Sequence, residues 1–277
     1  RPVWFDRAAY EADLIVPINR VKLHTDFVGP IQSGLCKMLV IGLGNHKGCS
    51  AVHEEAPEVF ADAIEETARL ILQKAPVGFG IAILENAYDK TYAVEAVPAE
   101  HLVEREKELV QIAKGNMPYI MLDEADVIVC GAIGKDISGA GFDPNILGRS
   151  SVLKQFVLHI PRYQRLVLCD VTPASHGNGI GVGLFDVITK KVAEQLDLES
   201  MYANAIACNC LGDASVPCTV DDEETAIRVA LKCCRNIDRD HPRIIRIQNT
   251  LHLGEIEVSE ALLDAVRADS RMSLIEN

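Results

Sequence analysis

The sequence predicts an α/β protein whose strands form mostly parallel sheets. Short apolar runs recur along the chain, and amphipathic helical stretches separate them. Runs that are apolar on both faces suit the strands of a parallel sheet covered by helices. Alternation of such strands with helices is typical of α/β folds. The 277 residues, 48% hydrophobic and 24% charged, are enough for two globular domains.

The expected strands and helices can be named in chain order. The strands cover 14–18, 77–84, 125–130, 166–171 and 244–247. The clearest helix covers 57–74, because Phe60, Ile64 and Ile71 lie near one stripe and Pro76 follows. The other helices are expected over 100–114, after a cap at Asp186, after a cap at Asp221 or Asp222, and over 258–267. The helix after Asp186 is expected to carry Val187, Ile188, Val192 and Leu196.

A domain boundary is expected near residues 115–118, where a charged helix ends and a new strand begins. Residues 1–117 should form part of one α/β domain, to which a C-terminal helix within 253–277 returns. Residues 118–252 should form a second domain with a doubly wound sheet. The active-site cleft is expected between the two domains.

Composition excludes several classes of partner. The net charge is −13 and the pI is near 5.1, and Lys and Arg are scattered singly. A nucleic-acid binder or a protein bound to an anionic membrane would need a basic face, so neither partner is expected. No apolar run approaches the roughly 20 residues that span a bilayer. Small anions remain open as ligands, because a local basic cluster can lie inside an acidic protein.

Nine cysteines without regular spacing do not predict a disulfide framework, and no signal peptide is seen. We therefore expect a cytoplasmic protein with reduced thiols. Cys208, Cys210, Cys233 and Cys234 could together bind zinc, but buried and inert thiols are the preferred interpretation. The chain starts at Arg1 without a methionine, so we expect it to be a fragment, a processed product or a chain whose front half was not included.

The segment 19–53 carries the densest set of reactive side chains. It follows the first strand, and ligands bind at the carboxyl ends of strands in open α/β sheets. Lys37 lies within an apolar run, and a desolvated lysine becomes a nucleophile. Asp26 can orient the ring of His24, and His53 ends the segment. Each histidine taken singly is more often a satisfied surface or core residue than a ligand.

Two further glycine-rich loops follow predicted strands. The loop 133–149 contains Asn145 and Arg149, and the loop 175–183 contains His176 and Asn178. Each could be a tight connection without further function. Polar loops that follow several strands of α/β sheets nevertheless favour a shared ligand cleft. The glycines at 42–48 match the dinucleotide fingerprint only loosely, so a structural turn is the preferred interpretation there.

Several long motifs in order are similar to one known family. They are NRVKLHTDFVGPIQSGLCKMLVIGLG at 19–44, ENAYD at 85–89, EAVPAE at 95–100, GKDISGAGFDPNILGR at 134–149 and HGNGIGVGLFD at 176–186. Across residues 6–263 the chain resembles the lactate-racemase-like isomerases that depend on a nickel-pincer nucleotide.

The resemblance implies two α/β domains and a pyridinium mononucleotide with two thio-acid arms that hold nickel. By position in the motif, Lys37 resembles the lysine that is joined covalently to the cofactor. His53 resembles the nickel ligand, and His24 resembles an acid–base histidine. The loop residues implied for cofactor binding are Asn145, Arg149, His176 and Asn178. The resemblance also implies proteins that build the cofactor as partners, so material made without them should lack it.

The implied reaction is racemisation or epimerisation of a 2-hydroxy acid. Hydride transfer to the cofactor and back inverts C2, and a histidine near neutral pKa suits the hydroxyl proton. The resemblance implies that the family's second catalytic histidine and its substrate arginine belong to a front part of the first domain, which we expect to precede Arg1. Ile146, Leu147 and Gly148 also depart from the family pattern, which implies a different or larger substrate.

Two other interpretations stay open. The first is a catalytically incomplete fragment or a domain that binds a small anion. The second is an NAD(P)-type oxidoreductase, which would need a G-x-G-x-x-G motif with an acidic residue about 20 positions later.

Overall fold

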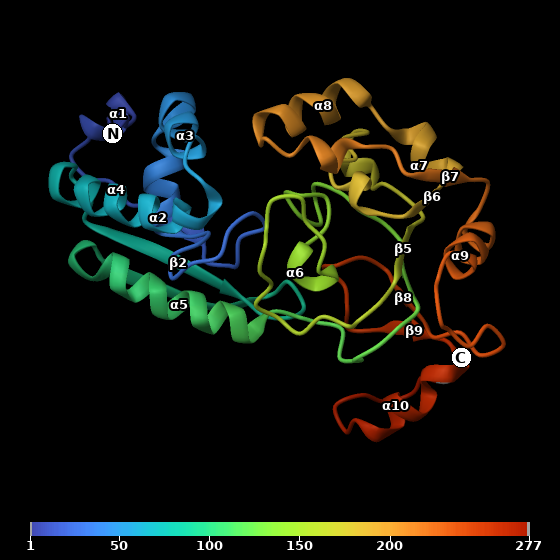
Figure 1. The fold of residues 1–277 in the computed structure, drawn as a ribbon. Helices are drawn as coiled ribbons and strands as arrows, with labels where there is room; N and C mark the ends of the chain where they lie inside the picture. The colour runs from blue at the N-terminus through green and yellow to red at the C-terminus, as the bar shows by residue number, and fades with distance from the viewer. Residues whose placement is uncertain (1, 276–277) are drawn as a thin grey trace. The chain divides into compact units, whose positions relative to one another are not determined.

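The computed structural model describes residues 2–275 and has the predicted α/β fold (Figure 1). Its strands form one three-stranded and one six-stranded sheet. The chain divides into two compact units, Arg1–Pro118 with Val152–Val157, and Tyr119–Ser151 with Leu158–Asn277. Within the described part of the chain, no helix is long and apolar enough to cross a membrane.

The sheet of the first unit has the order β1-β2-β3, formed by β1 (Ile18–Arg20), β2 (Phe79–Glu85) and β3 (Thr91–Pro98). β1 pairs parallel and β3 antiparallel with β2. The first strand was expected at 14–18, but Ile15 makes only an isolated bridge to Val77. Pro17, which has no N–H to donate, separates this bridge from β1. β3 was not predicted, because exposed residues alternate with half-buried ones along it.

Helices pack on β2 where a glycine lets them approach. A Cβ on Gly80 would lie 2.6 Å from the Leu35 side chain and 3.2 Å from that of Leu102. The expected helices over 57–74 and 100–114 are confirmed. The helical elements of this unit are α1 (Arg7–Tyr10), α2 (Leu35–Lys37), the π-helix η1 (Met38–Gly42), α3 (Asn45–His53), η2 (Pro57–Val59), α4 (Phe60–Lys74), η3 (Ala99–His101) and α5 (Leu102–Asn116).

The second unit contains the doubly wound sheet. Its strands are β4 (Val127–Cys130), β5 (Arg165–Leu168), β6 (Val187–Thr189), β7 (Cys218–Val220), β8 (Ile244–Ile247) and β9 (Ile256–Val258), in the order β7-β6-β5-β4-β8-β9. Only β9 is antiparallel to its neighbour. The chain runs outward from β4 to β7 and returns at β8 beside β4. The strand order therefore reverses between β4 and β8, which is where ligands bind in such sheets.

One face of this sheet is covered by α9 (Glu223–Lys232), whose Ala226 and Ala230 pack on Val127 and Val167. Asp222 caps α9 by accepting the Thr225 N–H at 2.8 Å, as predicted. The other helical elements of the unit are α6 (Pro144–Leu147), η4 (Pro173–Ser175), η5 (Val182–Leu184), α7 (Lys190–Gln195), α8 (Leu198–Ala207), η6 (Leu211–Ala214), η7 (Glu260–Leu262) and α10 (Leu263–Ala268).

The helix expected after Asp186 is present as α7 and buries Val192, but its predicted start and N-cap are wrong. Val187–Thr189 forms β6, and α7 begins only at Lys190 with Thr189 as its N-cap. β-branched residues favour a strand, and this one is buried between β5 and β7. The Asp186 carboxylate instead accepts the Leu166 N–H at 2.7 Å.

The C-terminal segment belongs to the second unit, which differs from the expected return to the first domain. β9 extends the six-stranded sheet by pairing with β8. The Ser259 N–H then donates to the Ile244 carbonyl at 2.9 Å, and η7 and α10 follow. Ile256 and Val258 are half-buried in this position, so the segment completes a sheet edge. Residues 276–277 of the predicted segment lie outside the described residues.

Candidate functional site

The loop 22–33 after β1 is closed on itself and fixes the backbone of His24. Lys22 and Ser33 exchange two backbone hydrogen bonds, of 2.9 and 3.2 Å. The buried Gln32 side chain accepts the His24 N–H at 2.8 Å and donates to the Gly29 carbonyl at 3.1 Å. The loop therefore holds His24 by hydrogen bonds from both the main chain and a side chain.

The His24 imidazole contacts two different partners through its two nitrogens. Nδ1 accepts the Asp26 N–H at 3.0 Å, and Nε2 is in hydrogen-bond contact with Lys37 Nζ. Only 12% of the side chain is exposed. Burial, followed by the positive charges of Lys37, His53 and Lys22, holds the pKa of His24 well below its usual value. The ring is therefore neutral at neutral pH.

Lys37 ends α2 and is followed directly by the π-helix η1, an irregularity frequent at functional sites. The turn that carries it is anchored from α5. Glu106 is fully buried, and its carboxylate accepts the Cys36 N–H at 2.8 Å. A Cβ on Gly34 would lie 2.6 Å from Glu106 Oε1, so a glycine is needed for this approach. Sequence patterns did not identify Glu106, because it lies in an otherwise charged helix.

Burial raises the pKa of Glu106 to about 7, although the Cys36 N–H counteracts this. Because the folded-state pKa exceeds the unfolded one, this carboxyl favours folding at low pH, and that contribution disappears as pH rises through about 7. Glu106→Gln should remove this dependence. In the unaltered protein the free energy of unfolding, measured by urea titration, should decrease from pH 5 to pH 8. In the variant this decrease should be smaller by on the order of 3 kcal/mol. An unchanged pH dependence would contradict the assignment.

His53, at the end of α3, presents one ring nitrogen as an acceptor. Its Nδ1–H donates to the Cys49 carbonyl at 2.7 Å, and the Cys49 thiol lies 3.4 Å from the same nitrogen. In a neutral imidazole this leaves the lone pair on Nε2. The side chain is exposed. A histidine oriented in this way by a backbone carbonyl is suited to bind a metal through Nε2.

Two phenylalanines connect the histidines. Ring centroids lie 4.3 Å apart between His24 and Phe27, 4.7 Å between Phe27 and Phe60, and 5.0 Å between Phe60 and His53. The structure thus brings together His24, Lys37 and His53 as one cluster within the first unit. Phe60 was expected only as a core residue of its helix, and Phe27 carried no pattern that would have identified it.

In the second unit, the buried Asn145 lies next to the point where the strand order reverses. Its N–H donates to Asp143 at 2.9 Å, and the Asp143 N–H donates to the Thr250 hydroxyl at 2.9 Å. Thr250 follows β8, and the loop that contains Asn145 follows β4. Thr250 and its neighbour Asn249 were missed, although they directly follow a predicted strand.

His176 and Asn178 lie in the loop that follows β5. His176 is exposed and adopts a left-handed conformation with φ 49°. The Asn178 side chain accepts the Ile180 N–H at 3.2 Å and donates to Asn204 at 3.3 Å. Both residues thus lie toward the carboxyl ends of the strands, as predicted from their position after 166–171. The cleft expected between the two domains stays a prediction.

Arg149 does not lie with them. Its guanidinium pairs with Asp186 at 2.7 Å and donates to the Leu184 carbonyl at 2.9 Å and the Gln164 carbonyl at 3.5 Å. Asp186 and Gln164 directly precede β6 and β5, so Arg149 lies at the amino ends of these strands. These contacts hold the segment that contains Arg149 against the sheet, away from the carboxyl ends of the strands.

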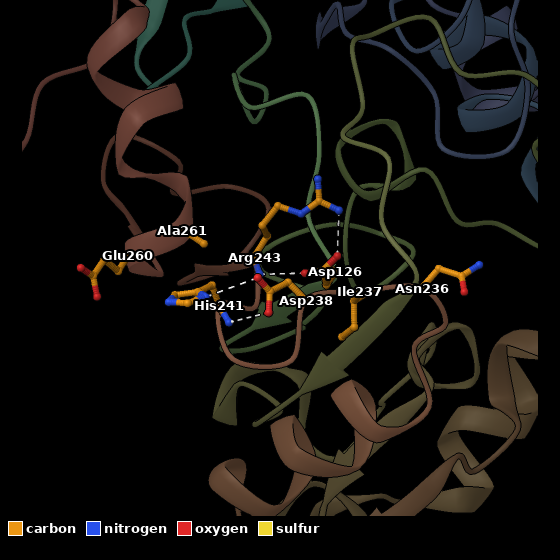
Figure 2. A pocket seen from close by; sticks show the side chains of 8 residues that line it. All are labelled: Asp126, Asn236, Ile237, Asp238, His241, Arg243, Glu260 and Ala261. Carbon is orange, nitrogen blue, oxygen red and sulfur yellow. Dashed lines mark hydrogen bonds and ion pairs between the residues drawn. The ribbon is translucent and has the colours of Figure 1, made fainter.

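Two cavities of about 490 and 550 Å³ also lie at the amino ends of the strands in the second unit. Figure 2 shows the smaller one, where Asp126 and Arg243 stand directly before β4 and β8. Neither cavity contains a residue that the sequence singled out. Because ligands of open α/β sheets bind at the carboxyl ends, we do not assign catalysis to these cavities.

No group of three potential metal ligands among His, Cys, Asp and Glu occurs within residues 2–275. Of the four thiols considered for zinc, Cys210 and Cys234 are buried, whereas Cys208 and Cys233 are exposed. Burial raises the pKa of Cys234, which therefore stays a thiol. No protein-family model matches the chain, and no curated protein matches it.

Proposed function

We propose that the chain belongs to a racemase or epimerase of 2-hydroxy acids that uses a nickel-pincer nucleotide attached to Lys37. The observation that carries this proposal is the cluster of His24, Lys37 and His53. They were selected from separate points of the segment 19–53 and lie together in one unit.

The residues present fit such a cofactor. Lys37 would hold it covalently, and its amine is in hydrogen-bond contact with the buried His24 imidazole. His53 would supply the metal ligand, since its Nδ1–H is held by the Cys49 carbonyl and its lone pair is on Nε2. Imidazole is a suitable ligand for nickel, and soft sulfur donors are a suitable addition. When bound, the cofactor supplies a hydride acceptor for C2 of the substrate.

His24 would exchange the proton of the substrate hydroxyl. Its imidazole is neutral, because burial and the nearby positive charges lower its pKa. A neutral imidazole can take up that proton as the hydride leaves C2. The closed loop 22–33 holds the ring in place, and this limits the reorganisation needed at each turnover.

The proposal is tested by nickel retention in protein produced together with the cofactor-building enzymes. His53→Ala should retain at least about ten-fold less nickel than the unaltered protein after desalting, because the metal loses its protein ligand. The mass of the peptide with Lys37 should stay that of the modified form. His46→Ala is the matched control, since His46 is exposed on the same helix, and it should retain nickel fully. Equal nickel in the His53→Ala and His46→Ala proteins would refute His53 as the ligand.

A further inference from the structure

The short helix that carries Lys37 does not supply its own N-terminal cap. The first N–H groups of a helix have no acceptor within the helix, and the N-cap residue of α2 is Gly34, which has no side chain to offer one. Together α2 and η1 cover residues 35–42, fewer than the roughly 12 that an isolated helix needs in water. The turn at Lys37 therefore depends on groups from other elements.

Glu106 of α5 provides the missing acceptor. Its Oε2 accepts the Cys36 N–H at 2.8 Å, and the side chain is fully buried. A Cβ on Gly34 would lie 2.6 Å from Oε1 and 2.7 Å from the carboxyl carbon, so a glycine at the N-cap leaves room for this carboxyl group. The residue that lacks a capping side chain thus makes space for one from another helix.

The polar contacts of the Glu106 carboxyl group belong to this turn. Burial raises its pKa, and the N–H of Cys36, the thiol of Cys36 and the N–H of Leu35 counteract the rise. Within residues 2–275, Oε1 has no hydrogen-bond partner. A buried carboxyl group is costly unless its hydrogen bonds compensate for the loss of water, and here α2 supplies the compensation.

The charged groups on the neighbouring elements pair with one another. Lys37 of α2 contacts the His24 ring. Burial and then Glu106 raise the pKa of Cys36, which therefore stays a thiol. The charged side chains of α4, α5 and the three strands form pairs of opposite charge, namely Glu65 with Arg69 and Lys107, Glu85 with Arg20, and Glu95 with Arg105.

The same turn is also held from the sheet. The Gly34 carbonyl accepts the Asn19 side-chain amide of β1 at 3.0 Å and the Met38 N–H at 3.0 Å. Lys37 stands between Cys36 and Met38, so the residues on both sides of it have fixed N–H groups. The backbone from which the Lys37 side chain extends to His24 is defined by these contacts.

We infer that Glu106 is a positioning residue for Lys37, because it supplies from α5 the cap that fixes the turn on which Lys37 stands. A displaced turn would move the Lys37 amine relative to the His24 ring, and reacting groups lose efficiency when they are misplaced by about 1 Å. The role of this turn in placing an attachment point for a cofactor rests on the proposed function. The hold of Glu106 on the turn does not.

The contact is tested first in protein made without the cofactor-building enzymes, by ¹H–¹⁵N spectra from pH 5.5 to 8.5. The Cys36 amide signal should follow a titration with a midpoint of about 7, because it donates to the Glu106 carboxyl group. Glu106→Gln should abolish this titration. Glu108→Gln, on the exposed side of the same helix, should leave it unchanged. A Cys36 amide that does not titrate, or that titrates alike in Glu106→Gln, would overturn the inference.

Amide hydrogen exchange at Met38 then measures how firmly the turn is held, relative to the amides of α9 in the other unit. Glu106→Leu removes the acceptor, and loss of a helix cap should speed exchange at Met38 at least about five-fold. Glu106→Gln keeps an oxygen acceptor and should stay within about two-fold of the unaltered protein. Equal rates in the leucine and glutamine variants would overturn the inference.

The link to the proposed function is tested in protein produced together with the cofactor-building enzymes. The fraction of Lys37 that carries the adduct should fall at least about five-fold in Glu106→Leu and be preserved in Glu106→Gln. An adduct fraction in Glu106→Leu equal to that of the unaltered protein would overturn the positioning role. Unmodified Lys37 in the unaltered protein would refute the proposed function, whereas the Cys36 titration and the Met38 exchange decide the role of Glu106 without it.

Discussion

Lys37→Ala is expected to reduce racemisation of 2-hydroxy acids on the order of 10⁴-fold, because it removes the proposed attachment point of the cofactor. The measurement is chiral chromatography of the product from each pure enantiomer, with protein produced together with the cofactor-building enzymes. Lys37→Arg should lose as much activity, since a guanidinium keeps the charge but does not form the amide-type bond.

Lys47→Ala is the control for this prediction. Lys47 lies on α3, where it is exposed and stacks 4.5 Å from the centroid of the Trp4 ring, so its loss should leave activity nearly unchanged. Full activity of Lys37→Arg would show that the position needs only a positive charge, and covalent attachment would then be wrong.

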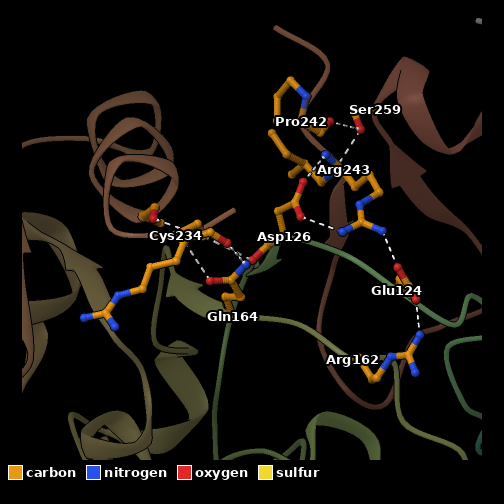
Figure 3. A network of polar contacts seen from close by, with 11 residues as sticks. Glu124, Asp126, Arg162, Gln164, Cys234, Pro242, Arg243 and Ser259 are labelled. Carbon is orange, nitrogen blue, oxygen red and sulfur yellow. Dashed lines mark hydrogen bonds and ion pairs between the residues drawn. The ribbon is translucent and has the colours of Figure 1, made fainter. Parts of the chain in front are cut away.

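Asp126→Ala should lower the free energy of unfolding by about 3 kcal/mol, because it breaks a buried ion pair. The Asp126 carboxylate accepts both the Arg243 N–H at 2.8 Å and its guanidinium at 2.9 Å, and only 2% of the Asp126 side chain is exposed. Figure 3 shows how this pair continues through Glu124 to Arg162. The network joins the amino ends of β4 and β8, so its loss should weaken the six-stranded sheet. Urea unfolding followed by circular dichroism measures the change.

Arg162→Ala provides the matched control from the same network. The Arg162 side chain is 81% exposed, and its contact with Glu124 is a surface ion pair, so the loss should stay below about 1 kcal/mol. If the Arg162 and Asp126 variants were destabilised equally, burial would not be what makes this network important.

The parts of the fold that the sequence predicted are those with one-sided or continuous apolar patterns. α4 was predicted because its buried residues follow a stripe, and β4 because all four of its residues are buried. β6 was mistaken for the start of a helix, since three residues are too few to show a period and Asp186 resembles an N-cap. The placement of β9 depends on pairing with β8, and local sequence does not reveal this.

The candidate site was predicted only in part for a similar reason. His24, Lys37 and His53 are reactive residue types within the segment 19–53, and the structure brings these side chains together. Their supports are ordinary in sequence. Glu106 looks like one more charge on a helix, and the Asp26 N–H that donates to His24 Nδ1 belongs to the backbone. Arg149 attracted attention as a cation in a glycine-rich loop, but tertiary contacts pair it with Asp186.

The most direct test of the central claim is the mass of the peptide that contains Lys37, from protein produced together with the cofactor-building enzymes. The account predicts a covalent adduct on Lys37, with trypsin failing to cleave after this residue, and nickel in the same protein. Unmodified Lys37 with normal tryptic cleavage, in protein from cells shown to make the cofactor, would contradict it.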